Sequence, residues 1–344
     1  MKRILPIAAV LLVAVIAAIS IATVRINNFL DTPVVLDNDG VSFTIEPGTS
    51  FGSVANALQQ TGIVSSADML SIYARWTDQA GRVQAGDYFI ADGTSARQIL
   101  EQFTSGAVQL YSFTIIEGWN RWDLLRELQS HPHLDASLTD EDWPALLEQL
   151  GAETTHPEGL FLPETYHFPN NTSDRTVLRQ AFELLQVTLA EEWAGKSESS
   201  IVDSPYEALI LASIIEKETA RADERQRIAG VFTRRLEKRM RLQTDPTVIY
   251  GIGRDFNGNL TRKDLQTATP YNTYTQRGLP PTPIAMAGRA AIHAALHPAD
   301  GEELYFVATG IADGSHKFSA TKEEHDDAVA AYLRQLRSNR SKGN

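Results

Sequence analysis

Residues 204–219 have the sequence SPYEALILASIIEKET, and this stretch predicts the most buried helix of the chain. Ser204 is a preferred N-cap, Pro205 suits the first helical position, and Glu207 completes a capping box. Apolar side chains then surround nearly all of the first three turns, which is typical of a helix inside a domain rather than on its surface. We therefore expect a buried helix that begins near residue 205 and ends at the EKE of residues 216–218.

Two glutamates near the end of this helix point in different directions. At about 100° per residue, Glu218 falls on the most apolar stripe, formed by Leu211, Ile214 and Ile215, and Glu216 points about 160° away. A carboxyl in apolar surroundings keeps its proton to higher pH, because burial disfavours the charged form. That property suits a general acid acting on a glycosidic oxygen. The alternative is that both glutamates pair with basic residues at the helix end, which are Lys217, Arg221 and Arg225.

The composition excludes several classes of protein. The chain has 344 residues and no cysteine, and its 43 acidic residues against 31 lysines and arginines give a formal net charge of -12. Without cysteine there is no disulfide, thiolate zinc site or cysteine nucleophile. The acidic balance argues against nucleic acid as a partner. The eight histidines show no HExxH or similar metal spacing, so we expect neither a metal nor another cofactor.

The N-terminus carries an apolar segment, Ile4–Val24, that contains no charged residue. Its 21 residues match the length that crosses a hydrocarbon core of about 30 Å. The alternative is a cleaved signal peptide, but such peptides have a shorter apolar region and a clearer cleavage site. We therefore expect residues 4–24 to form a transmembrane helix.

The charges around this segment predict its orientation. Lys2 and Arg3 precede it, so the positive-inside rule places residues 1–3 in the cytoplasm. We expect a single-pass protein of the inner (cytoplasmic) membrane, with a tether at residues 25–40 and a periplasmic remainder. The first 30 residues hold three basic and no acidic groups, so the remainder has 28 basic against 43 acidic residues, a charge of -15.

Three segments after the tether share one pattern, in which an aromatic and β-branched strand leads through a turn with an acidic residue and a glycine into a helix. The strands and turns occupy residues 43–50, 88–95 and 113–120. A further helix is expected at Ser66–Trp76. The resulting order of strand, helix, helix and strand resembles a LysM-like glycan-binding module, assigned to residues 41–110. A purely structural spacer is the alternative.

Several short motifs follow the buried helix. They are LQTDPT at residues 242–247, YNTY at 271–274 and GLPP at 278–281. Together they resemble the YceG-like family of endolytic murein transglycosylases, and the order of anchor, LysM-like module and catalytic domain also fits that family. We therefore expect an α+β protein that begins with a single transmembrane helix, followed by the LysM-like βααβ module. Residues 111–338 should form a mixed α/β catalytic domain that contains the buried catalytic helix. Residues 339–344 should form a basic tail.

The resemblance implies a lytic transglycosylase that cleaves peptidoglycan glycan strands between N-acetylmuramic acid and N-acetylglucosamine without water. It leaves 1,6-anhydro ends and terminates strand elongation. One carboxyl suffices, first as general acid and then as base. Aligning residues 215–219 with the Glu-Ser signature of goose-type lysozyme-like transglycosylases identifies this carboxyl as Glu218, because Thr219 then stands where their serine does. The family also suggests peptidoglycan synthases as partners.

Short polar and aromatic side chains in the motifs are expected to bind the glycan, and the alternative for each is turn chemistry or core packing. His297 is expected to be structural. Two other functions stay open: a lysozyme-like hydrolase, in which Asp245, Glu164 or Glu216 activates water, and a non-catalytic cell-wall-binding scaffold. The expected glycan-binding residues are Gln243, Thr244, Asp245, Tyr250, Tyr271, Asn272, Thr273 and Tyr274.

Overall fold

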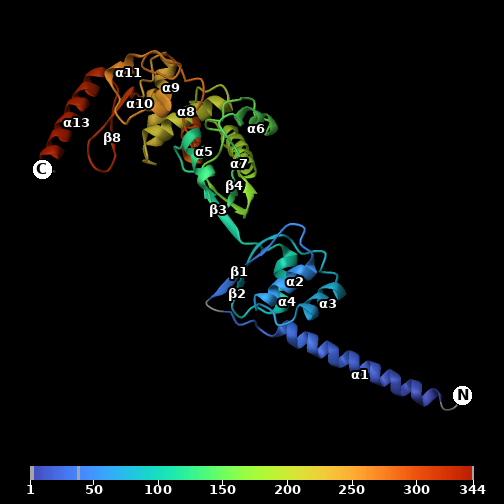
Figure 1. Ribbon diagram of the computed structural model, residues 1–344. Coiled ribbons are helices and arrows are strands. Elements are labelled where there is room, and N and C mark those ends of the chain that lie inside the picture. Colours follow the sequence, from blue (N-terminus) through green and yellow to red (C-terminus); the bar gives the residue numbers. More distant parts are fainter. Residues whose placement is uncertain (1–3, 37–38, 343–344) are drawn as a thin grey trace. The chain divides into compact units, whose positions relative to one another are not determined.

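The computed structural model describes residues 4–36 and 39–342, which form two compact units (Figure 1). The first unit extends to Tyr111 and includes His167–Asn171, and the second comprises Ser112–Tyr166 and the chain from Thr172 onward. Helices and short two-stranded sheets alternate along the chain, so the predicted α+β class is confirmed. The predicted cytoplasmic residues 1–3 lie outside the described residues.

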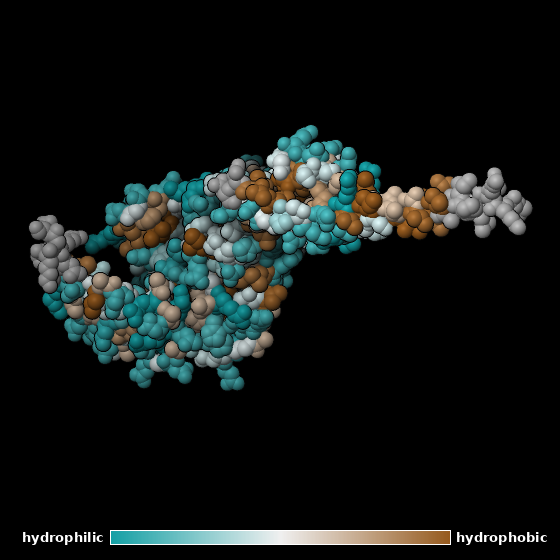
Figure 2. Space-filling view, turned by 90° about the horizontal axis from the view of Figure 1, so that it is seen from below, coloured by the Kyte–Doolittle hydropathy of each residue, from teal (hydrophilic) through white to brown (hydrophobic). Residues whose placement is uncertain are grey.

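The N-terminal helix α1 (Ile4–Asp31) is uninterrupted. Within it, Val10–Asp31 is long and apolar enough to cross a membrane. Between Val10 and Val24 its large apolar side chains are exposed: Val10 is 68% and Ile19 60% exposed, and Figure 2 shows apolar residues along the projecting helix. A continuous apolar surface of this kind is favourable in lipid and costly in water. The helix is therefore compatible with single-pass membrane anchoring.

The end of α1 belongs to the core of the first unit, so residues 25–31 of the tether predicted at 25–40 are helical instead. Leu30 is fully buried in that core. Arg97 of α4 (Ala96–Ser105) donates a hydrogen bond to Asp31 at 2.7 Å and another to Asn27 at 3.4 Å. The reason is visible in the sequence, because Ile26, Phe29 and Leu30 continue the helical spacing of apolar residues beyond the membrane segment.

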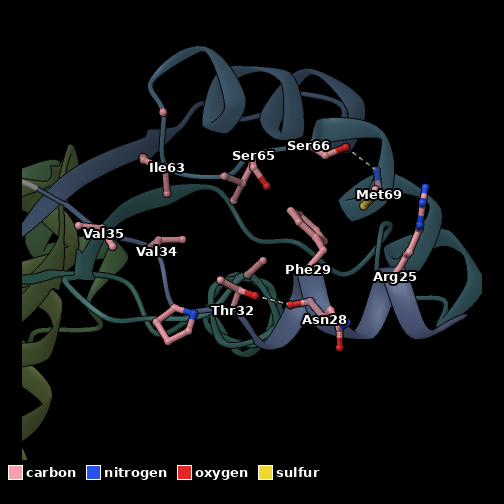
Figure 3. Close-up of a pocket in the computed structure, with 14 residues that line it drawn as sticks. Arg25, Asn28, Phe29, Thr32, Val34, Val35, Ile63, Ser65, Ser66 and Met69 are labelled. Carbon is pink, nitrogen blue, oxygen red and sulfur yellow. Dashed lines mark hydrogen bonds between the residues drawn. The ribbon is translucent and has the colours of Figure 1, made fainter. Parts of the chain in front are cut away.

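A surface cavity of about 640 Å³ lies beside this end of α1 (Figure 3). Arg25 and Phe29 of α1 contribute to its wall, together with Ile63 and Met69. The hydroxyl of Thr32 donates a hydrogen bond to the carbonyl of Asn28 at 2.5 Å where the helix ends. The last turns of α1 therefore form part of the surface of the first unit.

The first unit contains the predicted order of strand, helix, helix and strand. Its strands β1 (Gly40–Ile45) and β2 (Gly86–Ala91) pair antiparallel, with Phe43 opposite Tyr88. Between them lie α2 (Phe51–Gln60) and α3 (Ala67–Trp76). The βααβ order is thus present, and the resemblance to a LysM-like module stays a prediction.

The three predicted strand-turn-helix segments share a backbone feature. Gly48, Gly93 and Gly118 stand in the turns after β1, β2 and β3, and each has a φ of +80°. Residues with a side chain rarely adopt this conformation, so each turn requires its glycine. The helices that follow are α2, α4 and α5 (Arg121–Ser130), as the pattern predicted.

The second unit is mainly helical. Strand β3 (Leu110–Thr114) pairs with β5 (Thr165–Pro169), and β4 (Leu134–Asp135) runs parallel to β6 (Thr172–Ser173). Strands β7 (Tyr305–Ala308) and β8 (His316–Ser319) form an antiparallel pair. The helices are α6 (Trp143–Gln149), α7 (Asp174–Ala194), α8 (Pro205–Glu218), α9 (Arg225–Glu237), α10 (Asp245–Ile252), α11 (Arg262–Gln266), α12 (Arg289–Leu296) and α13 (Lys322–Lys342), with a short 3-10 turn at Gly253–Asp255.

Helix α8 is the central helix of this unit. Every residue from Ala208 to Ile215 is buried, and α7, α9, α10 and α12 pack around the helix. Ser204 accepts a hydrogen bond from the backbone N–H of Glu207 at 3.2 Å. The predicted capping box differs in one respect, because the Glu207 carboxylate accepts from the N–H of Asp203 at 2.8 Å rather than from that of Ser204. The sequence thus begins α8 where predicted, with a modified cap.

The C-terminal helix α13 continues to Lys342. The basic tail predicted at residues 339–344 is therefore, as far as Lys342, the end of this helix, and residues 343–344 lie outside the described residues. Helix α13 packs on β7 and β8, and this places its first turns beside the cleft described next.

Candidate active site

Glu218 is the last residue of α8 and borders a cleft of about 500 Å³. The chain leaves the helix at Thr219, whose backbone is extended, with a φ of -147°. Clefts of this size are typical of small-molecule and oligosaccharide sites. The other lining residues come from α9, the segment between α9 and α10, α10, the YNTY loop, β7, β8 and α13. They are Arg235, Leu242, Gln243, Asp245, Tyr274, Tyr305, Phe306, Val307, Ala308, His316, Lys322, His325 and Val329.

The Glu218 carboxyl is placed to hold a proton. Burial raises its pKa above the usual range, and the nearby charge of Asp245 raises it further. The hydroxyl of Thr244 donates a hydrogen bond to Oε1 of Glu218 and so favours the ionised form, as do the positive charges of His316 and Arg235. The effect of burial is the largest of these, so the pKa of Glu218 stays above its usual range.

Thr244 is itself held by two other threonines. Its backbone N–H donates to Oγ1 of Thr273 at 3.1 Å, and its carbonyl accepts from the hydroxyl of Thr247 at 2.8 Å. The hydroxyls of Thr247 and Thr273 lie 2.9 Å apart. All three residues are buried. This network fixes the Thr244 hydroxyl toward Glu218 and leaves Thr273 without access to the cleft.

Gln243 adopts the left-handed backbone conformation, with a φ of 53°. For a residue other than glycine this costs roughly 1–2 kcal/mol. Its N–H donates to the carbonyl of Thr273 at 3.2 Å, and its exposed side chain lines the cleft. Such strained positions are concentrated at functional sites. At this turn Gln243 lines the cleft, while the hydroxyl of the buried Thr244 reaches Glu218.

Asp245 and Tyr274 meet on the same side of the cleft. The Tyr274 hydroxyl donates to Oδ1 of Asp245 at 2.6 Å, and both side chains line the cleft. Asp245 begins α10, where a negative charge is favourable because of the helix dipole. Burial raises the pKa of Tyr274, so its hydroxyl stays protonated and remains a donor. The motifs LQTDPT and YNTY are thus brought together here.

Asn272 has a structural position. It is fully buried, and its side-chain nitrogen lies within hydrogen-bonding distance of the carbonyls of Asp264, Leu265 and Thr267, at 3.1, 3.1 and 2.6 Å. Its side-chain oxygen accepts from the N–H of Tyr274 at 2.9 Å. These contacts use both ends of the amide, so Asn272 shapes the loop that carries Tyr274.

Tyr250 and Tyr271 lie away from the Glu218 cleft. Tyr250 stacks on Trp122, with ring centroids 5.5 Å apart, and meets Tyr271 edge-on at 4.9 Å. The hydroxyl of Tyr271 lies 2.9 Å from that of Thr282. Tyr250 and Trp122 line a separate cleft that also includes Lys217. The structure therefore divides the eight predicted binding residues between a cleft wall and its supporting core.

The other acidic residues considered for water activation differ in position. Glu216 accepts from the N–H of Gly288 at 3.1 Å and lies 3.7 Å from Arg225, and burial raises its pKa. The alternative, pairing with basic residues, thus holds for Glu216, whereas Glu218 makes no ion pair within the described part of the chain. Glu164 is exposed and does not line the Glu218 cleft. Of the three candidates, only Asp245 lies there.

Glu158 is a buried carboxyl that was not among the predicted site residues. Both its oxygens accept from the N–H of Arg121 at the start of α5, at 3.1 and 3.0 Å, and it also bonds the hydroxyl of Tyr250. It is fully buried, and burial raises its pKa to about 7. It ties α5 to α10 beneath the surface of the second unit.

The sequence profile of the YceG-like family matches residues 43–331. The chain belongs to the YceG-like family. A protein of Bacillus subtilis (strain 168) named endolytic murein transglycosylase is 31% identical over 310 residues, which cover 85% of this chain and 85% of that protein. A protein of the same name from Streptococcus pneumoniae serotype 2 (strain D39 / NCTC 7466) is 26% identical over 327 residues, 85% of this chain and 58% of its own length.

A solved structure agrees with the family assignment. The crystal structure of a putative yceG-like protein from Listeria monocytogenes has a TM-score of 0.51 and 28% sequence identity to this chain, and the match covers 85% of this chain and 99% of that one. The matched family region includes Glu218, the LQTDPT and YNTY motifs and the strands that close the cleft.

Several cleft residues of this YceG-like chain carried no recognisable signal in the sequence. Arg235 is buried and stacks over Tyr305, with its guanidinium carbon 5.0 Å from the ring centroid. His325 stacks on the same ring, with centroids 5.1 Å apart. His316 is hydrogen-bonded to Glu224. No spacing rule connects these residues, because their meeting depends on how α13 and the β7–β8 pair fold back onto α9.

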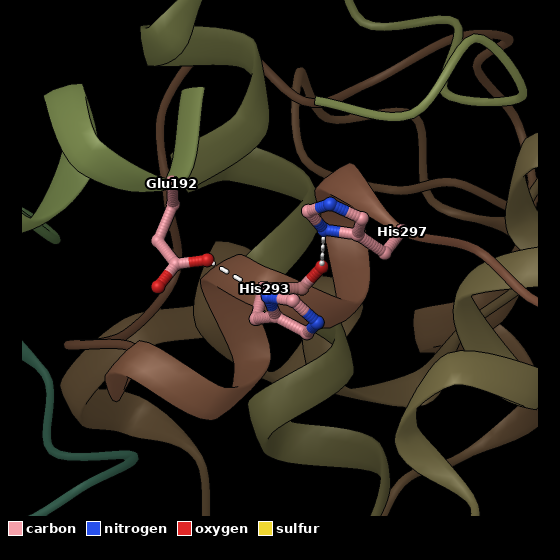
Figure 4. Close-up of side chains that lie close together, drawn as sticks. All are labelled: Glu192, His293 and His297. Carbon is pink, nitrogen blue, oxygen red and sulfur yellow. Dashed lines mark hydrogen bonds and ion pairs between the residues drawn. The ribbon is translucent and has the colours of Figure 1, made fainter. Parts of the chain in front are cut away.

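Outside the cleft, Glu192, His293 and His297 lie close together (Figure 4). Two histidines and a carboxylate suit a transition metal, but these groups already have protein partners. The Glu192 carboxylate contacts Nδ1 of His293 at 2.8 Å and Nε of Arg289 at 2.7 Å. His297 has Nε2 2.7 Å from the carbonyl of Gly195 and Nδ1 3.1 Å from that of His293. A cation would have to displace Arg289 and a carbonyl, and these contacts give His297 a structural position.

Proposed function

We propose that this YceG-like protein is an endolytic lytic transglycosylase that cuts nascent peptidoglycan strands between N-acetylmuramic acid and N-acetylglucosamine. The names of its relatives support the activity. The observation that carries the assignment to a site is the Glu218 carboxyl, whose pKa is raised by burial while Thr244 donates a hydrogen bond to it at the edge of a cleft. A single carboxyl of this kind can serve as acid and base in turn.

In the proposed reaction, protonated Glu218 gives its proton to the glycosidic oxygen as the bond to C1 of the muramic residue breaks. The Glu218 carboxylate is then stabilised by the hydroxyl of Thr244. The carboxylate takes the proton of the muramic 6-hydroxyl as that oxygen bonds to C1. The products are a 1,6-anhydro end and a new non-reducing end, and Glu218 regains its proton. Cleavage in this way ends the elongation of the strand.

The proposed glycan contacts come from the side chains that line the cleft, Gln243, Asp245 and Tyr274. Thr244 and Thr273 act as positioning residues through the threonine network. Asn272, Tyr250 and Tyr271 support the loops behind them, because their polar atoms contact protein groups.

A lysozyme-like hydrolase is the second candidate, because Asp245 lies in the same cleft as Glu218 and is a carboxylate that can activate water. The two functions differ in their products. A hydrolase adds one water per cut and leaves free reducing ends, whereas the transglycosylase leaves anhydro ends. A non-catalytic scaffold releases no fragments at all.

The deciding experiment incubates the full-length protein in detergent with purified glycan strands and analyses the products by mass spectrometry. We expect 1,6-anhydro ends from the wild type and none from Glu218→Gln. Glu164→Gln is the matched control, since Glu164 is exposed and outside the cleft, and it should cut as the wild type does. Free reducing ends from the wild type would establish the hydrolase instead.

We further propose that α1 anchors the protein in the inner membrane, with the N-terminus in the cytoplasm and both units in the periplasm. In this proposal the first unit binds glycan as a LysM-like module, and peptidoglycan synthases are partners of the protein. The chain has no cysteine, so a single introduced cysteine can report topology. Ser105→Cys, in the exposed end of α4, should react with a membrane-impermeant maleimide added to the periplasmic side. If Ser105→Cys reacted only after the inner membrane was permeabilised, the first unit would be cytoplasmic and the proposed orientation would be wrong.

A further inference from the structure

Glu224 and His316 form a carboxylate–histidine pair at the Glu218 cleft. Nδ1 of His316 lies 2.7 Å from Oε2 of Glu224, and the backbone N–H of His316 donates to Oε1 at 3.0 Å. The His316 side chain is 13% exposed and that of Glu224 only 6%. A histidine that donates from Nδ1 to a carboxylate has a fixed ring orientation and keeps Nε2 for other contacts.

The two residues come from separate elements that meet only in the folded protein. Glu224 precedes α9, and His316 begins β8. The ring of Phe306, on the paired strand β7, meets that of His316 edge-on at 5.5 Å. Arg221 lies 3.8 Å from the Glu224 carboxylate on the other side. Phe306 and Arg221 thus contact the two members of the pair, and of these two members His316 lines the cleft.

We propose that His316, held by Glu224, is a positioning residue for Glu218, and that the charge it presents to the cleft helps Glu218 to alternate between acid and carboxylate. The proposal rests on the proposed function in taking Glu218 as the acid. No proton leaves His316 in this role. Its positive form stabilises the carboxylate that appears on Glu218 after the glycosidic oxygen has been protonated.

The electrostatics of the cleft support this role. The charge of His316 lowers the pKa of Glu218, against the larger effect of burial. His316 contacts Glu224, and Arg221 lies behind that carboxylate. The other charged or titratable groups that line the cleft with His316 and Glu218 are Arg235, Asp245, Tyr274, Tyr305, Lys322 and His325. Burial and the charge of Lys322 lower the pKa of His325, so His325 is mainly neutral near pH 7. His316 is thus the cleft histidine with a carboxylate partner.

The first test is the pH profile of cleavage for His316→Gln and Glu224→Gln. Without the positive charge the Glu218 carboxyl should keep its proton to higher pH, so the alkaline limb should move up by about one pH unit. The rate should fall about ten- to a hundredfold at the optimum. The matched control is His293→Gln, because the Glu192–His293 pair has the same kind of contact, 2.8 Å, outside the cleft. It should leave the profile unchanged.

The second test needs no substrate. The difference in Tm between the wild type and Glu218→Gln, measured against pH, follows the titration of Glu218. Introducing His316→Gln, or Glu224→Gln if the first variant does not fold, into both backgrounds should move that titration to higher pH. An unmoved titration, or equal rate losses at all pH values, would overturn the proposal. If the titration of Glu218 moved but the protein formed no anhydro product, the effect of His316 on Glu218 would be supported and only the proposed function would be wrong.

Discussion

The hydroxyl of Thr244 donates a hydrogen bond to Oε1 of Glu218 across 26 residues of sequence. Burial favours the protonated form of this carboxyl, which suits the acid of the proposed reaction but not the base that follows in that proposal. The Thr244 hydroxyl and the His316 and Arg235 charges act in the opposite direction. The proposed double role of Glu218 depends on this opposition, because among the described residues that line the cleft Asp245 is the one other carboxylate.

Replacing Thr244 by valine should lower the cleavage rate and shift its pH dependence. Val matches Thr in shape but cannot donate, and a hydrogen bond to a charged group contributes about 1.5–3 kcal/mol, or roughly ten- to a hundredfold in rate. The pKa of Glu218 should rise further, so the alkaline limb of the rate profile should move to higher pH. The control Thr165→Val, at an exposed position of β5, should change neither quantity. An unaltered profile in Thr244→Val would contradict this role.

Glu218→Gln should be at least as stable as the wild type above pH 7 while losing activity. The folded pKa of Glu218 is raised, so its favourable contribution is complete below the unfolded value of about 4.5 and is lost as pH rises through the folded pKa. A neutral Gln has no buried charge to lose. Thermal unfolding followed at pH 5 and pH 8 measures this. A variant that loses more stability at pH 8 than at pH 5 would show that Glu218 is not a buried acid.

Glu158→Gln should show a pH-dependent gain in stability without an effect on the cleft. The pKa of Glu158 rises from 4.5 to about 7 in the folded protein, so the wild type loses stability between those two pH values. The loss amounts to about 3 kcal/mol at most. Denaturant unfolding at pH 5 and pH 8 should show the variant gaining relative to the wild type only at pH 8. Equal differences at both pH values would mean that Glu158 stays ionised.

Asn272→Ala and Gln243→Ala should separate support from substrate contact. Asn272→Ala leaves buried carbonyls and the N–H of Tyr274 without a partner, so it should cost about 2–4 kcal/mol of stability. Gln243→Ala removes an exposed side chain from the cleft and should reduce kcat/KM with little change in Tm. Denaturant unfolding and steady-state kinetics on both variants check this. The reverse pattern would make Asn272 the glycan ligand.

Much of the local structure follows from short patterns. The turns at Gly48, Gly93 and Gly118 were predicted from an acidic residue one or two positions before the glycine, and the start of α8 from Ser204 and Pro205. Such signals work because backbone preferences and caps act over a few residues. The helical spacing of apolar residues also continues from the membrane segment to Leu30. It is hard to recognise there because charged and polar residues lie between the apolar ones.

The candidate site is different, because the environment of Glu218 comes from distant parts of the chain. Helical spacing alone placed Glu218 on the apolar face of its helix, and the motifs named Gln243, Thr244, Asp245 and Tyr274. The sequence by itself therefore determined the helix, the carboxyl proposed as the acid and part of the cleft wall. Only the tertiary structure decided that Thr244 reaches Glu218 and that Glu224 and His316, 92 residues apart, meet beside it. Hydrogen bonds and charges act through space, over distances that no local pattern along the chain records.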